Sequence, residues 1–135
     1  MLRNGFIVIL LVIFLITPLI AAAQDVPAGK WWYNPKIQQN LNLSQKEIGQ
    51  LDKSFANSRR KLIKFKSDVE NEQFELDQLL SQKKVDDAKV KKQFRKLEKA
   101  RQTLANERLE FVISVRNILG AGRFQQLKSN YTSWQ

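Results

Sequence analysis

The chain contains neither cysteine nor histidine, and its single methionine is the initiator. Without cysteine no disulfide bond can form, so a domain of this size must be stabilised by packing alone. The usual ligands of zinc and copper are missing as well. Ser44, Ser58 and Ser114 have no histidine that could activate them as nucleophiles. We therefore expect no enzymatic activity, no cofactor and no high-affinity transition-metal site.

A weak metal site built from carboxylates alone is the remaining alternative. Glu72 lies one helical turn from both Asp68 and Glu75 and shares a face with each. We favour the interpretation that this stretch is a solvated helix face whose acids balance nearby lysines. The acidic residues concerned are Asp68, Glu70, Glu72, Glu75 and Asp77.

Residues 1–23 have the features of a secretory signal peptide. Arg3 is followed by an unbroken apolar run over residues 6–16, and the segment ends in three alanines. Small residues at these last positions are what a signal peptidase recognises, so we predict cleavage after Ala23 and location in the periplasm. An uncleaved membrane anchor over residues 6–23 is the alternative.

Glycine and proline are scarce, with five and three residues. Those that follow the leader lie mostly between periodic segments, where they indicate boundaries. We predict a mobile lead-in over residues 24–34 and one folded domain over residues 35–130. A short polar tail over residues 131–135 ends the sequence.

Apolar residues recur every seven positions along two long segments, which is typical of helices packed as in a coiled coil. The first segment, residues 45–82, opens with a capping box at Ser44 and Glu47, and Leu43 precedes it as a hydrophobic staple. Its stripe consists of Ile48, Phe55, Leu62, Val69 and Leu76, with companions at Leu51, Ser58, Phe65, Glu72 and Leu79.

The second segment, residues 87–119, follows an N-cap at Asp86. Because the connection between the segments is short, the two helices must lie antiparallel. We predict an all-α fold, a long antiparallel helical hairpin with short flanking helices over residues 35–40 and 123–130. The second stripe consists of Val90, Leu97, Leu104, Phe111 and Ile118, with companions four residues on at Phe94, Arg101, Arg108 and Val115.

Positive charge is the abundant feature of this chain, whose formal net charge is +10. For an exported protein, the acidic partners are lipid head groups, envelope polymers and acidic protein segments rather than nucleic acid. The alternative is that the positive charge serves only to keep the protein soluble. We predict a client- or partner-binding surface made of Arg59, Arg60, Lys61, Lys64, Lys66, Lys92, Arg95, Lys96, Lys99, Arg101 and Arg108.

Some apolar residues do not fit into the single seam of a two-helix hairpin. Terminal segments or a second subunit could cover them, or some could stay exposed to bind apolar segments of other proteins. The charged Arg101 and Arg108 we place at the edge of their stripe, since an unpaired buried charge is costly. The extra apolar residues are Trp31, Trp32, Tyr33, Phe74, Leu80 and Val112.

Three segments carry a family resemblance: residues 31–47, the charged hairpin around residues 59–62, and residues 118–124. Leu43-Ser44 matches the Leu-Thr of a repeat motif whose Gln position is held by Glu47. The second copy has Gly120 for Thr and Arg123 for Gln. The pattern resembles the periplasmic Spy/CpxP family, also called the LTxxQ family, which includes zinc resistance-associated and heavy-metal-resistance proteins.

The resemblance implies a four-helix hairpin that dimerises into a curved cradle. Members act as ATP-independent chaperones, as adaptors to envelope sensor kinases, or as metal-responsive proteins that use ligands this chain lacks. We therefore expect a homodimeric holdase-type chaperone and envelope stress protein that binds unfolded or acidic clients. The alternatives are an adaptor or metal-resistance-associated sensor that docks on a sensor-kinase domain, and a protein that contacts the membrane surface.

Overall fold

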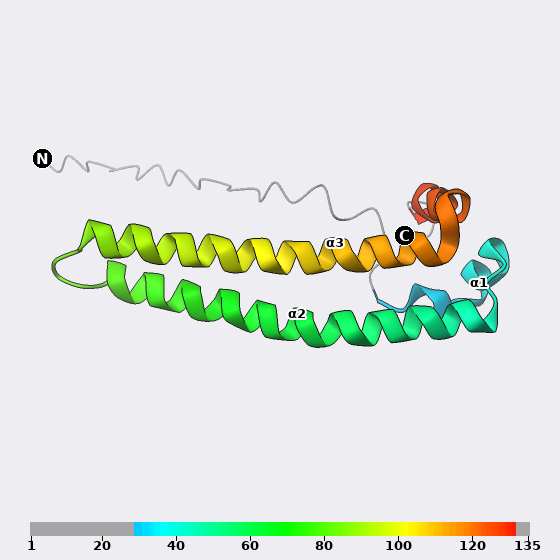
Figure 1. The fold of residues 1–135 in the computed structure, drawn as a ribbon, viewed down its shortest axis with the longest axis horizontal. Helices are drawn as coiled ribbons and strands as arrows, with labels where there is room; N and C mark the ends of the chain where they lie inside the picture. The colour runs from blue at the N-terminus through cyan, green and yellow to red at the C-terminus, as the bar shows by residue number, and fades with distance from the viewer. Residues whose placement is uncertain (1–28, 132–135) are drawn as a thin grey trace, which may run out of the picture.

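The computed structural model describes residues 29–131, which form helices and no strand. One turn of 3-10 helix, η1 (Trp31–Tyr33), precedes the short helix α1 (Pro35–Leu41). The long helices α2 (Gln45–Leu80) and α3 (Asp87–Tyr131) follow. They run antiparallel, and the loop between them lies at the end of the rod opposite α1 (Figure 1). The predicted all-α helical hairpin is confirmed.

The helix starts follow from local sequence. The Asn34 side chain accepts a hydrogen bond from the Lys36 backbone N–H at 2.9 Å, which caps α1. The Ser44 hydroxyl accepts from the Glu47 N–H at 3.1 Å, and the Glu47 carboxylate accepts from the Ser44 N–H at 2.9 Å. The predicted capping box is therefore present at the start of α2.

The register of the hairpin is the one expected for a closure around Val85. The hydroxyls of Ser54 and Ser114 form a hydrogen bond of 2.6 Å across the seam. Further toward the loop, the Lys61 Nζ lies 3.5 Å from a carboxylate oxygen of Glu107. Residues of α2 thus meet residues of α3 at equal distances from the loop.

Helix α3 breaks at Gly120, whose φ of 79° and ψ of 167° lie in a region that is essentially restricted to glycine. The helix resumes immediately, and the segment after the break turns sharply away from the hairpin axis (Figure 1). It packs near α1, where the Gln126 side chain donates to the Asn40 carbonyl at 3.1 Å. The sequence predicted this break, although it placed the start of the last helical segment at residue 123.

The main hydrophobic core lies at the end of the rod where η1, α1, the start of α2 and the end of α3 meet. The Trp32 ring packs edge-on against Phe55 with a centroid distance of 5.5 Å, and Phe55 packs similarly against Phe111 at 5.9 Å. The buried cluster contains Trp31, Trp32, Ile37, Leu41, Ile48, Leu51, Val115, Leu119 and Leu127.

The folded domain therefore begins at about Trp31, before the predicted boundary at residue 35. Trp31 and Trp32 are both buried, and their rings contact edge to face at 5.3 Å. Within the described chain, this part of the lead-in over residues 24–34 is core rather than a mobile segment. A single 3-10 turn is too short to show a periodic pattern, which is why the sequence did not reveal it. The predicted signal peptide over residues 1–23 and most of the tail over residues 131–135 lie outside the described residues.

The seam on α3 corrects one prediction. Its first stripe faces α2 as predicted, and Leu97 is buried. Toward the loop the companion residues lie three positions on rather than four: Gln93 and Glu107 are only 8% and 9% exposed, whereas Phe94 is 48% exposed. At the core end the predicted companion Val115, four positions after Phe111, is fully buried. Arg108 is exposed, at the edge of the stripe as expected. The sequence pattern did not indicate that Gln93 and Glu107 are buried, because both are polar.

Candidate binding surface

Between the core and the loop lies the middle of the hairpin, which we call the shaft. The α2–α3 seam in the shaft contains polar residues, which limits how tightly the two helices pack there. The Gln93 side chain donates a hydrogen bond to the Glu72 backbone carbonyl at 3.0 Å. Ser58 is buried on the opposite helix, and among residues 29–131 its hydroxyl has no hydrogen-bond partner. A buried hydroxyl without a partner costs free energy. The shaft is therefore a less stable element than the core.

The eleven predicted surface residues are all exposed, but they do not form one surface. Most of them lie on one of two flanks of the hairpin. Along one, which we call the groove flank, lies a shallow groove of about 320 Å³. It is lined by Phe65, Asp68, Asn71, Glu72, Lys96, Lys99, Ala100 and Thr103.

Cations on the groove flank are balanced by carboxylates. The Lys64 Nζ lies 2.9 Å from a carboxylate oxygen of Asp68, and Lys61 pairs with Glu107 at 3.5 Å. Lys96 and Lys99 share the groove with Asp68 and a second carboxylate. The local positive field on this flank is therefore weak.

The other flank is defined by two neighbouring heptad rows, and we call it the open flank. Arg101 connects the rows, because its guanidinium donates to the Gln73 side chain of α2 at 3.2 Å while it pairs with Glu98 at 2.6 Å. Residues seven apart lie on the same face of a supercoiled hairpin. The rows are Arg59, Lys66 and Gln73 on α2, and Phe94, Arg101 and Arg108 on α3.

The open flank keeps an excess of positive charge. Among residues 29–131, Arg59, Lys66 and Arg108 have no carboxylate within 4 Å. Ile63, one turn from both Arg59 and Lys66, is 63% exposed. This flank thus combines cations with an exposed apolar side chain at its edge. The remaining predicted cations, Arg60, Lys92 and Arg95, lie outside both defined groups.

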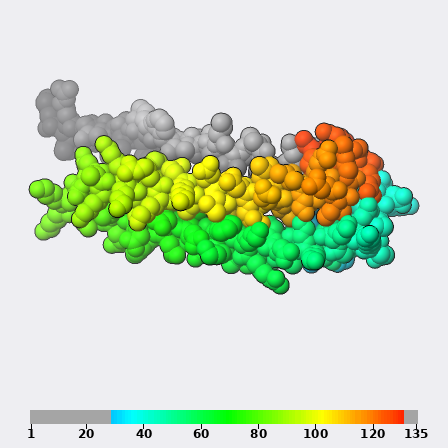
Figure 2. Space-filling view, in the orientation of Figure 1, coloured from blue at the N-terminus to red at the C-terminus, as the bar shows by residue number. Residues whose placement is uncertain are grey.

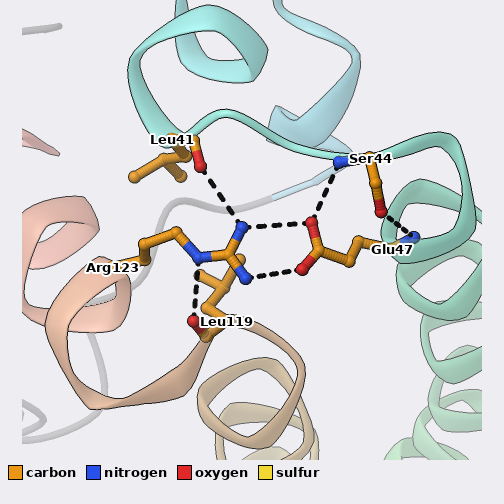
Figure 3. Close-up of polar contacts among 5 residues, drawn as sticks. All are labelled: Leu41, Ser44, Glu47, Leu119 and Arg123. Atoms are coloured by element: carbon orange, nitrogen blue, oxygen red, sulfur yellow. Dashed lines mark hydrogen bonds and ion pairs between the residues drawn. The ribbon is translucent and has the colours of Figure 1, made fainter.

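The two degenerate motif copies contact each other directly (Figure 3). Arg123 forms a bidentate ion pair with Glu47, with N–O distances of 2.5 and 3.0 Å, and also donates to the Leu41 carbonyl at 3.3 Å. The guanidinium holds the pKa of Glu47 down at about 2, with the Ser44 backbone N–H contributing. The sequence named Glu47 as a cap but missed Arg123 as its partner. The sequence did contain a signal for this pair: Glu47 and Arg123, which have opposite charges, occupy the glutamine positions of the two motif copies.

A second polar cluster fastens η1 to α2, and the sequence did not reveal it. Asp52 accepts hydrogen bonds from the Trp32 indole N–H at 3.0 Å and from the Tyr33 hydroxyl, and Lys30 lies 3.5 Å away. The pKa of Asp52 is lowered, chiefly by the hydrogen bond from Tyr33. The same hydrogen bond raises the pKa of Tyr33. This cluster positions the tryptophans over the core.

Comparison with known proteins identifies the family. The sequence profile of a family described as heavy-metal resistance matches residues 7–126. The chain belongs to this heavy-metal resistance family. The resemblance to the Spy/CpxP-like helical proteins is thereby confirmed. Searches of curated proteins and of solved structures gave no match.

The residues present do not fit the metal that the family description implies. Among residues 29–131, no group of three or more acidic, histidine or cysteine side chains could hold a metal ion. Two carboxylates of the acidic stretch have other partners, since Asp68 pairs with Lys64 and Asp77 accepts from Gln73 at 3.1 Å. In the same part of this heavy-metal resistance protein, no helix is both long and apolar enough to cross a bilayer.

Proposed function

We propose that this heavy-metal resistance family protein is a periplasmic, ATP-independent holdase that binds unfolded proteins during envelope stress. The observation that carries the proposal is the open flank, where Arg59, Lys66 and Arg108 lack carboxylate partners in the described chain. A flank with an excess of positive charge beside exposed apolar side chains suits segments of unfolded protein, which present acidic and apolar groups together.

The binding mode follows from the strength of each contact. Exposed charges attract an acidic segment over distances up to the screening length, about 8 Å at physiological ionic strength. Separate apolar contacts with Ile63 and Phe94, which are 63% and 48% exposed, then hold the segment weakly. Weak contacts release the client without nucleotide hydrolysis.

Composition links this activity to heavy metals. Metal ions bind cysteine and histidine side chains and thereby disturb other proteins. A chaperone that contains neither residue offers these ions no soft or imidazole ligand and can remain folded where its clients do not. We propose protection of metal-damaged clients rather than capture of the metal.

An aggregation assay tests the proposed function. A chemically denatured client is diluted with the wild-type protein in several-fold excess, at low and high salt, and light scattering is recorded. Suppression that weakens with salt is expected. No suppression at several-fold excess contradicts the holdase function.

Charge reversals locate the surface. Arg59→Glu, Lys66→Glu and Arg108→Glu together should reduce suppression several-fold. The matched control reverses three exposed lysines of α3 that belong to neither heptad row, Lys92, Lys96 and Lys99, and should retain suppression. Equal losses in both variants would exclude the open flank as the binding surface.

The family description favours one alternative, a metal-resistance-associated sensor or adaptor that docks on a sensor-kinase domain. A zinc or copper titration that raises the melting temperature would support it. We also propose export and homodimerisation: mass spectrometry should find a mature N-terminus at Gln24, and light scattering should give twice the mass of the mature chain.

A further inference from the structure

The free end of the hairpin, residues 80–96, overlaps the two flanks only at Phe94 and Lys96 and otherwise carries features of its own. We call it the tip. Leu80 at the end of α2, Val85 in the loop and Phe94 near the start of α3 are 52%, 41% and 48% exposed. Figures 1 and 2 show that the tip projects at the end of the rod opposite the core. These apolar residues are therefore far from the main hydrophobic core.

Basic residues also exceed acidic ones at the tip, by seven to two. Its acidic residues are Asp86 and Asp87, both at the start of α3, where Asp86 accepts a hydrogen bond from the Lys89 N–H at 3.2 Å. They complement the helix N-terminus and do not neutralise the lysines. The seven basic residues are Lys83, Lys84, Lys89, Lys91, Lys92, Arg95 and Lys96.

The shape of the tip distinguishes between possible partners. Two shallow grooves lie on the described hairpin, one beside Phe65 and Lys96 and one nearer the core beside Ser114 and Ile118. None of the three exposed apolar residues lines either groove. A tightly bound peptide segment occupies a groove, where apolar side chains converge, unlike the weakly held clients proposed for the open flank. Leu80, Val85 and Phe94 instead come from two helices and a loop at a convex end. A lipid interface accepts such separate side chains, while the lysines remain at the level of the head groups.

We propose that the tip docks on an anionic lipid surface. Leu80, Val85 and Phe94 enter the boundary between head groups and acyl chains, and the seven cations contact the negatively charged head groups. The contact is peripheral, because no helix of the described chain could span the bilayer. The proposal does not require the holdase function: the tip shares Phe94 with the open flank but uses none of the cations Arg59, Lys66 and Arg108.

Vesicle sedimentation tests the proposal with the full mature chain. Phosphatidylcholine vesicles with added phosphatidylglycerol should bind the protein, and vesicles of phosphatidylcholine alone should not. The tip variant Lys83→Glu, Lys84→Glu and Lys91→Glu should bind at least about tenfold more weakly. Its matched control carries the same charge change at the core end through the exposed Lys36, Lys46 and Lys53. Equal weakening in both variants, or binding that is insensitive to phosphatidylglycerol, overturns the proposal.

A fluorescent label reports insertion separately from charge. Because the chain has no cysteine, Val85→Cys can be labelled at one site with a polarity-sensitive dye. Anionic vesicles should raise its emission, while the same dye at Gln39→Cys in α1 should not respond. An unchanged signal at position 85 contradicts insertion. Displacement of the protein from vesicles by an equal charge concentration of soluble polyglutamate would identify an acidic polypeptide as the partner instead.

Discussion

Glu47 and Arg123 join residues that are far apart in the chain. Arg123 is held in place by three acceptors, Glu47, the Leu41 carbonyl and the Leu119 carbonyl, so that one guanidinium contacts α1, α2 and both sides of the break in α3. Bidentate pairs of this kind are stronger and more directional than single hydrogen bonds. The pair therefore fixes the C-terminal segment against the core.

Removing either partner should destabilise the protein. Glu47→Gln and Arg123→Gln should each lower the free energy of unfolding by about 1.5–3 kcal/mol, because a partly buried charge loses its partner. The double variant, which restores glutamine at both motif positions, should lose less than the sum of the two. Urea unfolding of the four proteins measures this coupling, and additive losses would show that the pair has no direct coupling.

The same pair should make stability depend on acid. The pKa of Glu47 is lowered from 4.5 to about 2 in the folded state, chiefly by the Arg123 hydrogen bond. The ion pair therefore contributes its full stabilisation above about pH 4.5 and loses it as the pH falls toward 2. Melting temperatures recorded across this range should fall more steeply for the wild type than for Glu47→Gln. Parallel curves would contradict the assignment.

Gly120 is required for its backbone conformation and not for space. A Cβ at either Gly120 or Gly122 would meet no atom within 4 Å, but only Gly120 has a positive φ. Gly120→Ala should therefore cost about 1–3 kcal/mol through backbone strain. Gly122→Ala, the control, should be neutral or stabilising by up to about 1 kcal/mol, since alanine favours helix. Thermal unfolding distinguishes the two, and equal effects would contradict the backbone explanation.

At the scale of the helices, the α2–α3 seam changes character along its length. Aromatic rings and the Ser54–Ser114 pair fill it near the core, whereas Ser58, Gln93 and Glu107 enter it in the shaft. The polar contacts specify the register but bury little apolar area. We expect the shaft to depend on matched polar partners more than on packing.

Two serines one turn apart on α2 allow a hydroxyl with a hydrogen-bond partner to be compared with one that has none among residues 29–131. Ser54 bonds to Ser114, so Ser54→Ala should lower the free energy of unfolding by about 1 kcal/mol. Ser58 is buried and its hydroxyl has no partner among residues 29–131, so Ser58→Ala should leave stability unchanged or raise it by up to about 1 kcal/mol. Calorimetry on both variants provides the measurement. A loss at Ser58 comparable with that at Ser54 would mean that its hydroxyl has a partner in solution.

Helix positions could be predicted from this sequence more reliably than helix contacts. Caps at Asn34 and Ser44, and the break at Gly120, depend on neighbouring residues, and the structure has them where predicted. The inner companions of α3 could not be found from apolar spacing because Gln93 and Glu107 are polar. The division of cations between two flanks depends on which carboxylates lie across the seam, and that information exists only in three dimensions.

For the molecule as a whole, the packed core and the tip are at opposite ends of a rod (Figure 2). Within the described chain, the hydrophobic cluster is made from residues before Phe55 and after Phe111, together with those two rings. Protection of amide hydrogens from exchange should therefore be highest in residues near Leu51 and Val115 and should decrease toward Val85. Hydrogen-exchange mass spectrometry measures this gradient. Uniform protection would show that the rod opens as one unit.

The position of the core also determines when it can form during synthesis. Ribosomes make the chain from its N-terminus, and Trp32, Leu41 and Leu51 have to wait for Val115, Leu119 and Leu127 before they are covered. Until then, α2 is a single amphipathic helix whose apolar stripe is uncovered, while contacts near the loop can already close locally. The core of a nascent chain of this protein therefore stays open until the chain is almost complete, and a chain whose core has not closed suits the export through a narrow channel that we propose.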